Sequence, residues 1–372
     1  MLQEVMVAAA SLSRRRFFYA AAGGKRNGER TGKPMPLRYV RDSTAGIRRL
    51  RTTRGFRYVD VDNNPLRDLA TLERIQRLAI PPAWREVWIC PLPDGHLQAT
   101  GRDARGRKQY RYHQEWTQRR NQDKFLHVVS FGAALPRLRR RVRADLRLPG
   151  MPREKVLALA VAVMGRTLLR VGNGEYARSN RSYGLTTLRN SHVEVLPGGA
   201  LLLRFQGKAG QAQRYRLDDK RLVKLLRRCR DLPGQPLFQY LDDGGNPHPI
   251  DSGDVNQYLR QATGEDVTAK DFRTWGATLA AMMTFAQVEV PEDASERALA
   301  LLEAAEVAKV AAWLGNTPAV CRRAYIDPRV FSAWRDGRLA PLRGLRGARQ
   351  WEAAALRLLG DKGRNQGANA RV

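Results

Sequence analysis

Residues 154–171 read EKVLALAVAVMGRTLLRV, and this apolar stretch decides the fold of the larger part of the chain. Its apolar side chains run almost continuously with helical spacing, which is typical of an α-helix buried in a core. Gly172 ends the predicted helix. A second helical pattern, over residues 115–148, precedes it. The larger part of the chain is therefore predicted to form around a buried helix.

Downstream of this helix, short alternating segments predict a small sheet. Residues 192–196, 201–206 and 213–217 have the period of β-strands, and glycine-rich turns at 197–199 and 207–210 separate them. We expect a three-stranded antiparallel sheet. Helical patterns then cover residues 220–230, 254–263, 272–287 and 294–314, and a last helix begins at Pro318.

Upstream of the helices, residues 37–112 alternate in the manner of strands. Strands are predicted at residues 56–61, 87–90, 97–100 and 109–112, with one helix at 69–79. The predicted fold class is therefore α+β, with a small β-rich N-terminal domain and a mainly α-helical domain that contains the three-stranded sheet. The predicted boundaries are 1–35 for a disordered basic extension, 36–114 and 115–342 for the two domains, and 343–372 for a basic C-terminal tail.

Composition indicates a folded protein with a polyanionic partner. The 372 residues include 66 Lys and Arg against 36 Asp and Glu, which gives a formal net charge of +30. Hydrophobic residues make up 43% of the chain, with 7 Trp, 11 Tyr and 10 Phe, enough to build a core. The charge therefore belongs to a folded protein rather than to a disordered basic arm.

Several classes of protein are excluded by what the sequence lacks. Cys90, Cys229 and Cys321 are scattered and form no CxxC pair, so neither a disulfide framework nor a zinc site is expected. The five histidines are dispersed without an HExxH pattern, which argues against a metal-dependent nuclease. No apolar run approaches the roughly 18 residues of a membrane span. We expect a soluble protein of a reducing compartment, without a metal.

Two glycine-rich stretches match nucleotide-binding patterns only in part. Residues 172–177, GNGEYA, follow a helix, whereas a dinucleotide-binding turn must follow a strand. Residues 101–108, GRDARGRK, lack the Gly-Lys-Ser/Thr of a phosphate-binding loop. No nucleotide cofactor is expected.

Five ordered stretches carry a family resemblance. They are LRVGNGEY (169–176), FQGK (205–208), KDFRTWG (270–276), LGNTP (314–318) and RAY (323–325). Together they resemble the small type IB DNA topoisomerases of the bacterial and poxviral branch, whose catalytic domain is shared with the tyrosine recombinases. GLTTL (184–188) and GRKQYRY (106–112) extend the resemblance, so that it covers roughly residues 37–342. It implies that the mainly helical domain is a tyrosine-recombinase-like catalytic domain.

The resemblance implies a role for each candidate catalytic residue. Tyr325 would attack the phosphorus of DNA and leave a 3′-phosphotyrosine and a free 5′-hydroxyl. Arg170 and Arg273 would stabilise the charge on the nonbridging oxygens. Lys208, at the tip of the hairpin, would protonate the departing 5′-oxygen, and Lys270 is a second candidate contributor.

Asn316 departs from the common family pattern, because many relatives carry His at this position. An amide can still donate a hydrogen bond to a nonbridging oxygen, but it cannot titrate. Asn316 is therefore assigned a hydrogen-bonding role only.

The strand predicted at 109–112 is a candidate DNA-binding element. Tyr110 and Tyr112 share one of its faces, and a cross-strand aromatic pair is the structural alternative. The resemblance places this strand in the major groove, where basic side chains contact phosphates while tyrosines and Gln109 contact sugars and base edges. The residues expected to contact DNA are Arg107, Lys108, Gln109, Tyr110, Tyr112 and Tyr176.

Taken singly, the candidate catalytic residues have structural explanations. Arg170 could neutralise a helix end, Lys208 could be solvated in its turn, and Tyr325 could be a core aromatic residue. The ordered set on a chain of +30 charge favours catalysis.

The resemblance implies a two-lobed clamp around duplex DNA that relaxes supercoils. One strand would be cleaved through a 3′-phosphotyrosyl intermediate, rotated and religated, without ATP or a metal. The alternatives are a site-specific tyrosine recombinase or integrase and a non-catalytic architectural DNA-binding protein. We expect a monomer, no membrane association, and a cytoplasmic, nucleoid-associated location.

Overall fold

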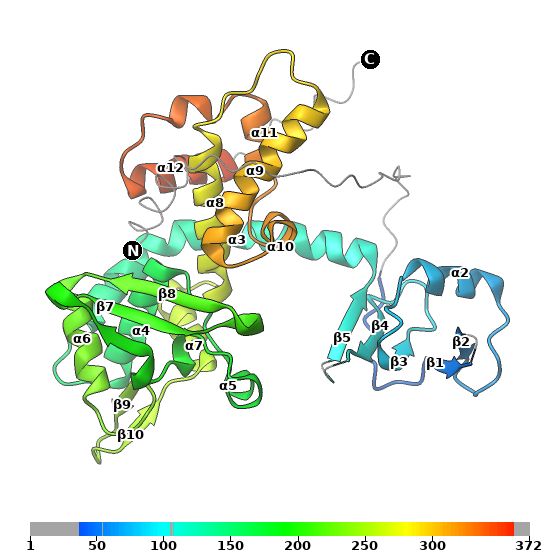
Figure 1. Cartoon of the computed structure of the whole chain (residues 1–372), viewed down its shortest axis with the longest axis horizontal. Helices are drawn as coiled ribbons and strands as arrows, with labels where there is room; N and C mark the ends of the chain where they lie inside the picture. Colours follow the sequence, from blue (N-terminus) through cyan, green and yellow to red (C-terminus); the bar gives the residue numbers. More distant parts are fainter. Residues whose placement is uncertain (1–36, 54, 105, 107, 361–372) are drawn as a thin grey trace. The chain divides into compact units, whose positions relative to one another are not determined.

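A computed structural model of the chain describes residues 37–53, 55–104, 106 and 108–360. These residues divide into two compact units, and the boundary falls between Lys124 and Phe125, within helix α3 (Gln114–Asp145). It therefore falls inside this helix, ten residues after the boundary predicted between residues 114 and 115 (Figure 1). The predicted extension at 1–35 lies outside the described residues.

The smaller unit contains a five-stranded antiparallel sheet in the order β2-β1-β3-β4-β5. Its elements are β1 (Ile47–Thr52), β2 (Gly55–Val59), α2 (Leu69–Arg77), β3 (Arg85–Ile89), β4 (Leu97–Arg102) and β5 (Lys108–Tyr112). Ile75 of α2 packs with Ile47, Val87, Ile89 and Ala99 of the sheet to form a small core. The four predicted strands and the helix are present, whereas β1 was not predicted.

The larger unit is mainly helical and contains the predicted three-stranded antiparallel sheet, in the order β6-β7-β8. Its strands are β6 (Val193–Val195), β7 (Leu201–Gln206), β8 (Ala212–Leu217), β9 (Gln239–Leu241) and β10 (Pro247–Pro249). Its further helices are α4 (Arg153–Thr167), α5 (Gly174–Asn180), α6 (Lys220–Arg230), α7 (Ser252–Thr263), α8 (Ala269–Phe285), α9 (Glu296–Leu314), α10 (Pro318–Ala324), α11 (Arg329–Arg335) and α12 (Ala348–Gly360). The predicted α+β fold class is confirmed.

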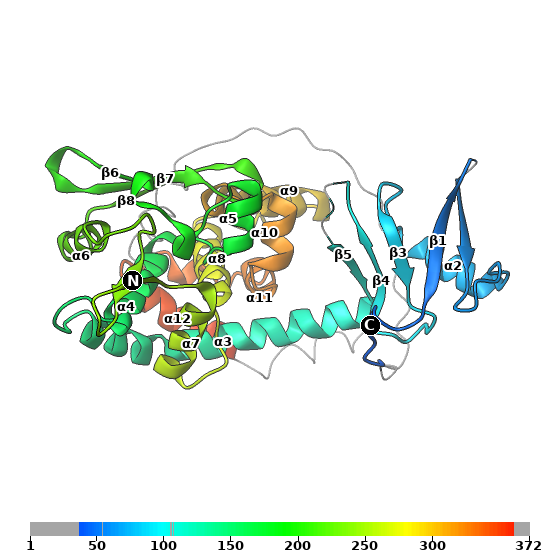
Figure 2. The same ribbon diagram turned by 90° about the horizontal axis from the view of Figure 1, so that it is seen from below.

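Two long buried helices, α4 and α8, organise this unit. Both are buried along almost their whole length, and their apolar side chains fill the main core. The sheet β6-β7-β8 lies next to α4 and α6, while α9, α11 and α12 gather at the other end of the unit (Figures 1 and 2). The core thus holds the ends of several helices in fixed positions.

Helix α4 ends earlier than the sequence predicted. Leu168 has a left-handed backbone (φ 51°) and its N–H bonds to the carbonyl of Met164 at 2.8 Å, which closes the helix before residue 171. Arg170 therefore lies beyond the helix. Its backbone carbonyl accepts a 2.9 Å hydrogen bond from the N–H of Leu185. A Cβ on Gly184 would lie 2.6 Å from the Arg170 carbonyl oxygen, so this close approach requires glycine.

Part of the predicted basic tail is a packed helix. In α12, Trp351, Ala355 and Leu359 are buried in the main core, and Arg139 of α3 forms an ion pair with Glu352. The predicted tail at 343–372 is corrected accordingly, because apolar residues at helical spacing give this basic segment a buried face. Residues 361–372 lie outside the described residues.

The described part of the chain contains no helix long and apolar enough to cross a membrane. It also contains no cluster of three or more His, Cys, Asp or Glu side chains suited to a metal ion. Cys90, Cys229 and Cys321 are buried free thiols.

Candidate active site

Tyr325 stands immediately after the short helix α10. That helix begins with Pro318, and Thr317 caps it by accepting a 3.4 Å hydrogen bond from the N–H of Val320. Tyr325 closes the other end through a 3.0 Å bond from its N–H to the carbonyl of Cys321. Tyr325 is only partly buried and packs against the main core.

Arg273 is buried beside this ring. Its guanidinium carbon lies 5.2 Å from the Tyr325 ring centroid. Nη1 donates to the carbonyl of Leu168 and Nη2 donates to that of Leu314 at 2.9 Å. These carbonyls belong to the C-terminal ends of α4 and α9, where the helix dipoles favour a cation. Two helix ends therefore hold the guanidinium in place.

Arg170 approaches the same point from the segment after α4. Its Nη2 donates to Asn316 Oδ1 at 2.6 Å and to the carbonyl of Gly315 at 3.3 Å. Burial lowers the pKa of the Arg170 guanidinium, the positive charge of Arg273 lowers it further, and a side-chain hydrogen bond with Tyr325 opposes this shift. Arg170, Arg273, Asn316 and Tyr325 thus form one cluster.

Two hydrogen-bond donors in this cluster have no partner among the described residues. They are Nε of Arg273 and Nδ2 of Asn316, and both atoms are buried. A buried donor without a partner lowers the stability of the fold by about 1–3 kcal/mol, so such a group usually binds a ligand or water. Since both donors belong to the cluster around Tyr325, the site is arranged to receive an anionic acceptor such as a phosphate group.

Lys208 lies at the turn between β7 and β8 and is exposed. No hydrogen bond or ion pair joins it to Arg170, Arg273 or Tyr325 in the described structure. The base of its turn is nevertheless close to the cluster, because the side chain of Gln213 lies near both Gly207 in the turn and Gly315 beside Asn316. A Cβ on Gly207 would meet Gln213 Cγ at 2.8 Å, and one on Gly315 would meet Gln213 Nε2 at 3.3 Å.

A hollow of about 510 Å³ separates β8 from the end of α9. Its lining comes from residues 211–215 and from Ala312, Trp313, Gly315 and Asn316. Within it, Tyr215 donates to Gln213 Oε1 at 2.7 Å. Burial raises the pKa of the Tyr215 hydroxyl, while the charges of Arg273 and Arg170 act against that rise. This hydroxyl therefore lies within electrostatic range of both arginines.

Lys270 is exposed near the start of α8, and the contacts of the described residues do not bring it into the cluster. Tyr176, on α5, is also exposed. Their predicted roles stay predictions.

Family comparisons identify the chain. Residues 113–332 match the catalytic core of eukaryotic DNA topoisomerase I, and residues 55–103 match the N-terminal domain of bacterial DNA topoisomerase IB. The chain belongs to the type IB DNA topoisomerase family. The DNA topoisomerase 1B of Acanthamoeba polyphaga mimivirus is 36% identical over 238 residues, which cover 63% of this chain and 70% of the viral protein. That of vaccinia virus (strain Copenhagen) is 24% identical over 289 residues, 74% of this chain and 84% of its own.

The predicted family and enzyme class are therefore confirmed. Topoisomerases of this family are isomerases that relax supercoiled DNA by transient cleavage of one strand, and DNA is the substrate of this chain.

The predicted DNA-binding strand is β5 of the smaller unit. Tyr110 and Tyr112 stack with their ring centroids 6.0 Å apart and are 47% and 40% exposed, so they form an accessible aromatic surface. Lys108 is bound to Asp42 by a 2.6 Å ion pair, and Gln109 Nε2 donates to Asp103 at 3.0 Å. Arg107 lies outside the described residues.

The site residues predicted from the sequence do not include Gln213, Tyr215, Thr278 and Asp327. The pattern of the strand after Lys208 could have indicated Gln213 and Tyr215, because alternate residues of a strand share one face. No local pattern marks the hydrogen bond between Thr278 and Asp327, because it joins residues 49 positions apart in the chain.

Proposed function

We propose that Tyr325 is the nucleophile and that Arg170, Arg273, Asn316 and Lys208 complete the catalytic set. The observation that carries this proposal is the pair of buried, unpartnered donors, Arg273 Nε and Asn316 Nδ2, in the cluster around Tyr325. Donors that are already in position need no reorganisation when charge develops in the transition state.

Cleavage proceeds by transesterification. The Tyr325 oxygen loses its proton to solvent and attacks the phosphorus, while the bond from phosphorus to the 5′-oxygen breaks. The phosphate remains on the 3′ side as a tyrosyl ester. Because this ester conserves the bond energy, the free 5′-hydroxyl can reverse the reaction after the strand has rotated. Neither ATP nor a metal is needed for that balance.

The two arginines and Asn316 stabilise the additional negative charge of the pentavalent phosphorane. Arg273 offers Nε, and Asn316 offers Nδ2 because its Oδ1 is already occupied by Arg170. Each such donor contributes on the order of 10²- to 10³-fold to the rate in comparable oxyanion sites.

Lys208 is proposed as the general acid that protonates the departing 5′-oxygen. Its exposed position at the hairpin tip would allow its ammonium group to reach a bound duplex, and the side chain of Gln213 lies close to both Gly207 of the hairpin and Gly315. Lys270 is a secondary candidate for the same proton transfer.

DNA contacts are proposed for Lys108, Gln109, Tyr110 and Tyr112 on β5, together with Tyr176 on α5. The exposed pair of tyrosines supports the interaction with sugars and base edges. We further propose that the enzyme acts as a monomer without a nucleotide cofactor, in the cytoplasm and associated with the nucleoid.

The match of residues 55–103 to a bacterial topoisomerase IB N-terminal domain favours a topoisomerase over a recombinase that uses the same chemistry. Incubation with supercoiled plasmid in EDTA, without ATP, tests the proposal. We expect relaxation by the wild type, and DNA binding without a covalent adduct by Tyr325→Phe. Covalent cleavage by Tyr325→Phe would exclude this nucleophile.

A further inference from the structure

The segment that follows Tyr325 contains an ion pair between the buried Asp327 and the partly buried Arg329. Asp327 is 0% exposed, and its carboxylate accepts two bonds from the guanidinium of Arg329: Nε donates to Oδ1 at 3.0 Å and Nη2 donates to Oδ2 at 2.7 Å. The backbone N–H of Arg329 adds a third bond to Oδ1 at 3.0 Å. A bidentate pair of this kind fixes direction as well as distance.

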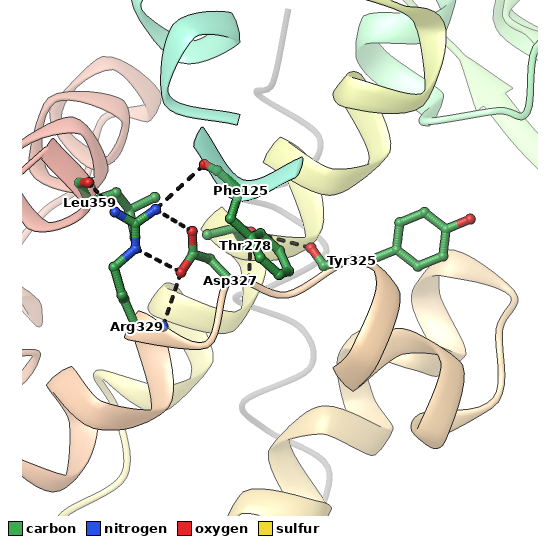
Figure 3. A network of polar contacts seen from close by, with 6 residues as sticks. All are labelled: Phe125, Thr278, Tyr325, Asp327, Arg329 and Leu359. Carbon is green, nitrogen blue, oxygen red and sulfur yellow. Dashed lines mark hydrogen bonds and ion pairs between the residues drawn. The ribbon is translucent and has the colours of Figure 1, made fainter. Parts of the chain in front are cut away.

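The same guanidinium reaches two helices that are distant in the sequence. Nη1 donates to the carbonyl of Leu359 in α12, and Nη2 approaches the carbonyl of Phe125 in α3 at 3.4 Å (Figure 3). Helix α12 lies beyond residue 332, where the match to the family's catalytic core ends. Arg329 therefore joins the catalytic core to a helix outside that match.

On its other side, the network reaches the backbone of Tyr325. The hydroxyl of Thr278, in α8, donates to the Tyr325 carbonyl at 3.2 Å and accepts from the Asp327 N–H at 3.2 Å. Thr278 is fully buried. Since α8 also carries Arg273, this hydroxyl ties the nucleophile's backbone to the helix that positions a phosphate-binding group.

The Tyr325 ring itself points away from this network (Figure 3). The buried groups therefore cannot contact the reacting oxygen, and any influence on the reaction must act through the backbone. A displacement of about 1 Å at a reacting group can cost on the order of 10²-fold in rate.

We propose that Arg329 is a positioning residue, which holds the segment after Tyr325 against α12 and α3. The helix α12 thereby helps to align the nucleophile. This inference rests on the proposed function, because it assumes that Tyr325 attacks the DNA.

A positioning role has a kinetic signature that distinguishes it from acid catalysis. Loosening the segment gives Tyr325 additional freedom before cleavage, and the covalent ester with DNA removes that freedom. Cleavage should therefore slow more than religation, and the equilibrium should shift toward intact DNA. Loss of the general acid Lys208 slows both directions by the same factor, because one transition state serves both, and leaves the equilibrium unchanged.

The experiment compares full-length Arg329→Lys, which keeps the charge but loses the planar fork, with wild type. Cleavage of plasmid by excess enzyme is measured from adducts trapped with detergent, together with the covalent fraction at equilibrium. We expect cleavage to be roughly 10- to 100-fold slower, a smaller covalent fraction and unchanged DNA affinity. A wild-type rate and covalent fraction would overturn the proposal.

Arg139→Gln is the matched control. It removes a second contact between α3 and α12, the ion pair with Glu352, without touching the segment after Tyr325. We expect a comparable loss of thermal stability but a wild-type covalent fraction. If Arg139→Gln lowered the covalent fraction as much as Arg329→Lys, the effect would be one of general stability and the proposal would fail.

If Arg329→Lys unfolds at the assay temperature, variants of Thr278 test whether the same network aligns Tyr325. Thr278→Val keeps the shape but removes the bridging hydroxyl, whereas Thr278→Ser retains it. We expect Val to reduce the covalent fraction and Ser to restore it, and equal values for the two would contradict the proposal. Failure of the proposed function is recognised separately, since Tyr325→Phe would then still form covalent adducts.

Discussion

Asn316 Oδ1 accepts a 2.6 Å hydrogen bond from Nη2 of Arg170, and this bond determines which way the amide faces. With its oxygen occupied, the amide presents Nδ2, a buried donor without a partner among the described residues. Arg170 therefore orients the amide of Asn316. The amide serves as an acceptor toward the protein and as a donor toward the substrate.

The effect of a substitution at Asn316 should depend on whether the new side chain keeps both the acceptor for Arg170 and the donor for the phosphate. Asn316→His offers one ring nitrogen to Arg170 and an N–H to the phosphate, so relaxation should stay close to wild type. Asn316→Asp keeps the acceptor but removes the donor and adds a negative charge beside the phosphate. We expect its single-turnover cleavage to be about 10²- to 10³-fold slower. If Asp and His variants cleaved equally fast, Nδ2 would have no role as a donor.

Lys208→Ala should slow cleavage by about 10²- to 10⁴-fold, because the departing 5′-oxygen loses its proton donor. A substrate with sulfur at the 5′ bridging position needs no proton on leaving, so it should restore the rate of this variant. Lys270→Ala, the matched lysine on α8, should lose less activity and gain less from the sulfur. An unrescued Lys208→Ala would indicate that this lysine stabilises charge instead.

Arg273→Lys should be strongly impaired although the charge is retained. One ammonium group cannot bond the carbonyls of Leu168 and Leu314 and also present a donor in the position of Nε. We expect cleavage to fall by about 10²- to 10³-fold, the cost of one oxyanion donor. Thermal unfolding and DNA affinity, measured in parallel, separate this loss from destabilisation. Cleavage near the wild-type rate would show that the fork geometry is unimportant.

The sequence predicted the elements whose side chains follow a clear period. Helix α6 and strand β7 have the predicted bounds, because each has one regular apolar face. Strand β1 was missed, since IRRLRT has only scattered apolar residues and is stabilised by pairing with β2 and β3. The end of α4 was misplaced because Leu168 turns left-handed in a stretch that is still apolar.

For the site, the ordered motifs predicted which residues are candidates, and the fold brings Arg170, Arg273, Asn316 and Tyr325 together. What the sequence could not supply is the set of contacts that hold them. The bonds of Arg329 to Leu359 and Phe125 join residues far apart in the chain, and they depend on tertiary packing.

Lys108 is expected to contribute to the salt dependence of DNA binding. Each phosphate neutralised by a cation contributes about −0.9 to the slope of log affinity against log salt. In the free protein Lys108 is paired with Asp42, whose hydrogen bond raises the pKa of the lysine, so Asp42 competes with a phosphate for this ammonium group. Asp42→Asn frees the lysine and should both tighten binding and steepen the slope. Lys108→Ala should then reduce the slope by about one in the Asp42→Asn background, and by less when Asp42 is present. Tyr325→Phe, which changes no charge, should keep the wild-type slope. Equal slopes for Asp42→Asn with and without Lys108 would show that this lysine contacts no phosphate.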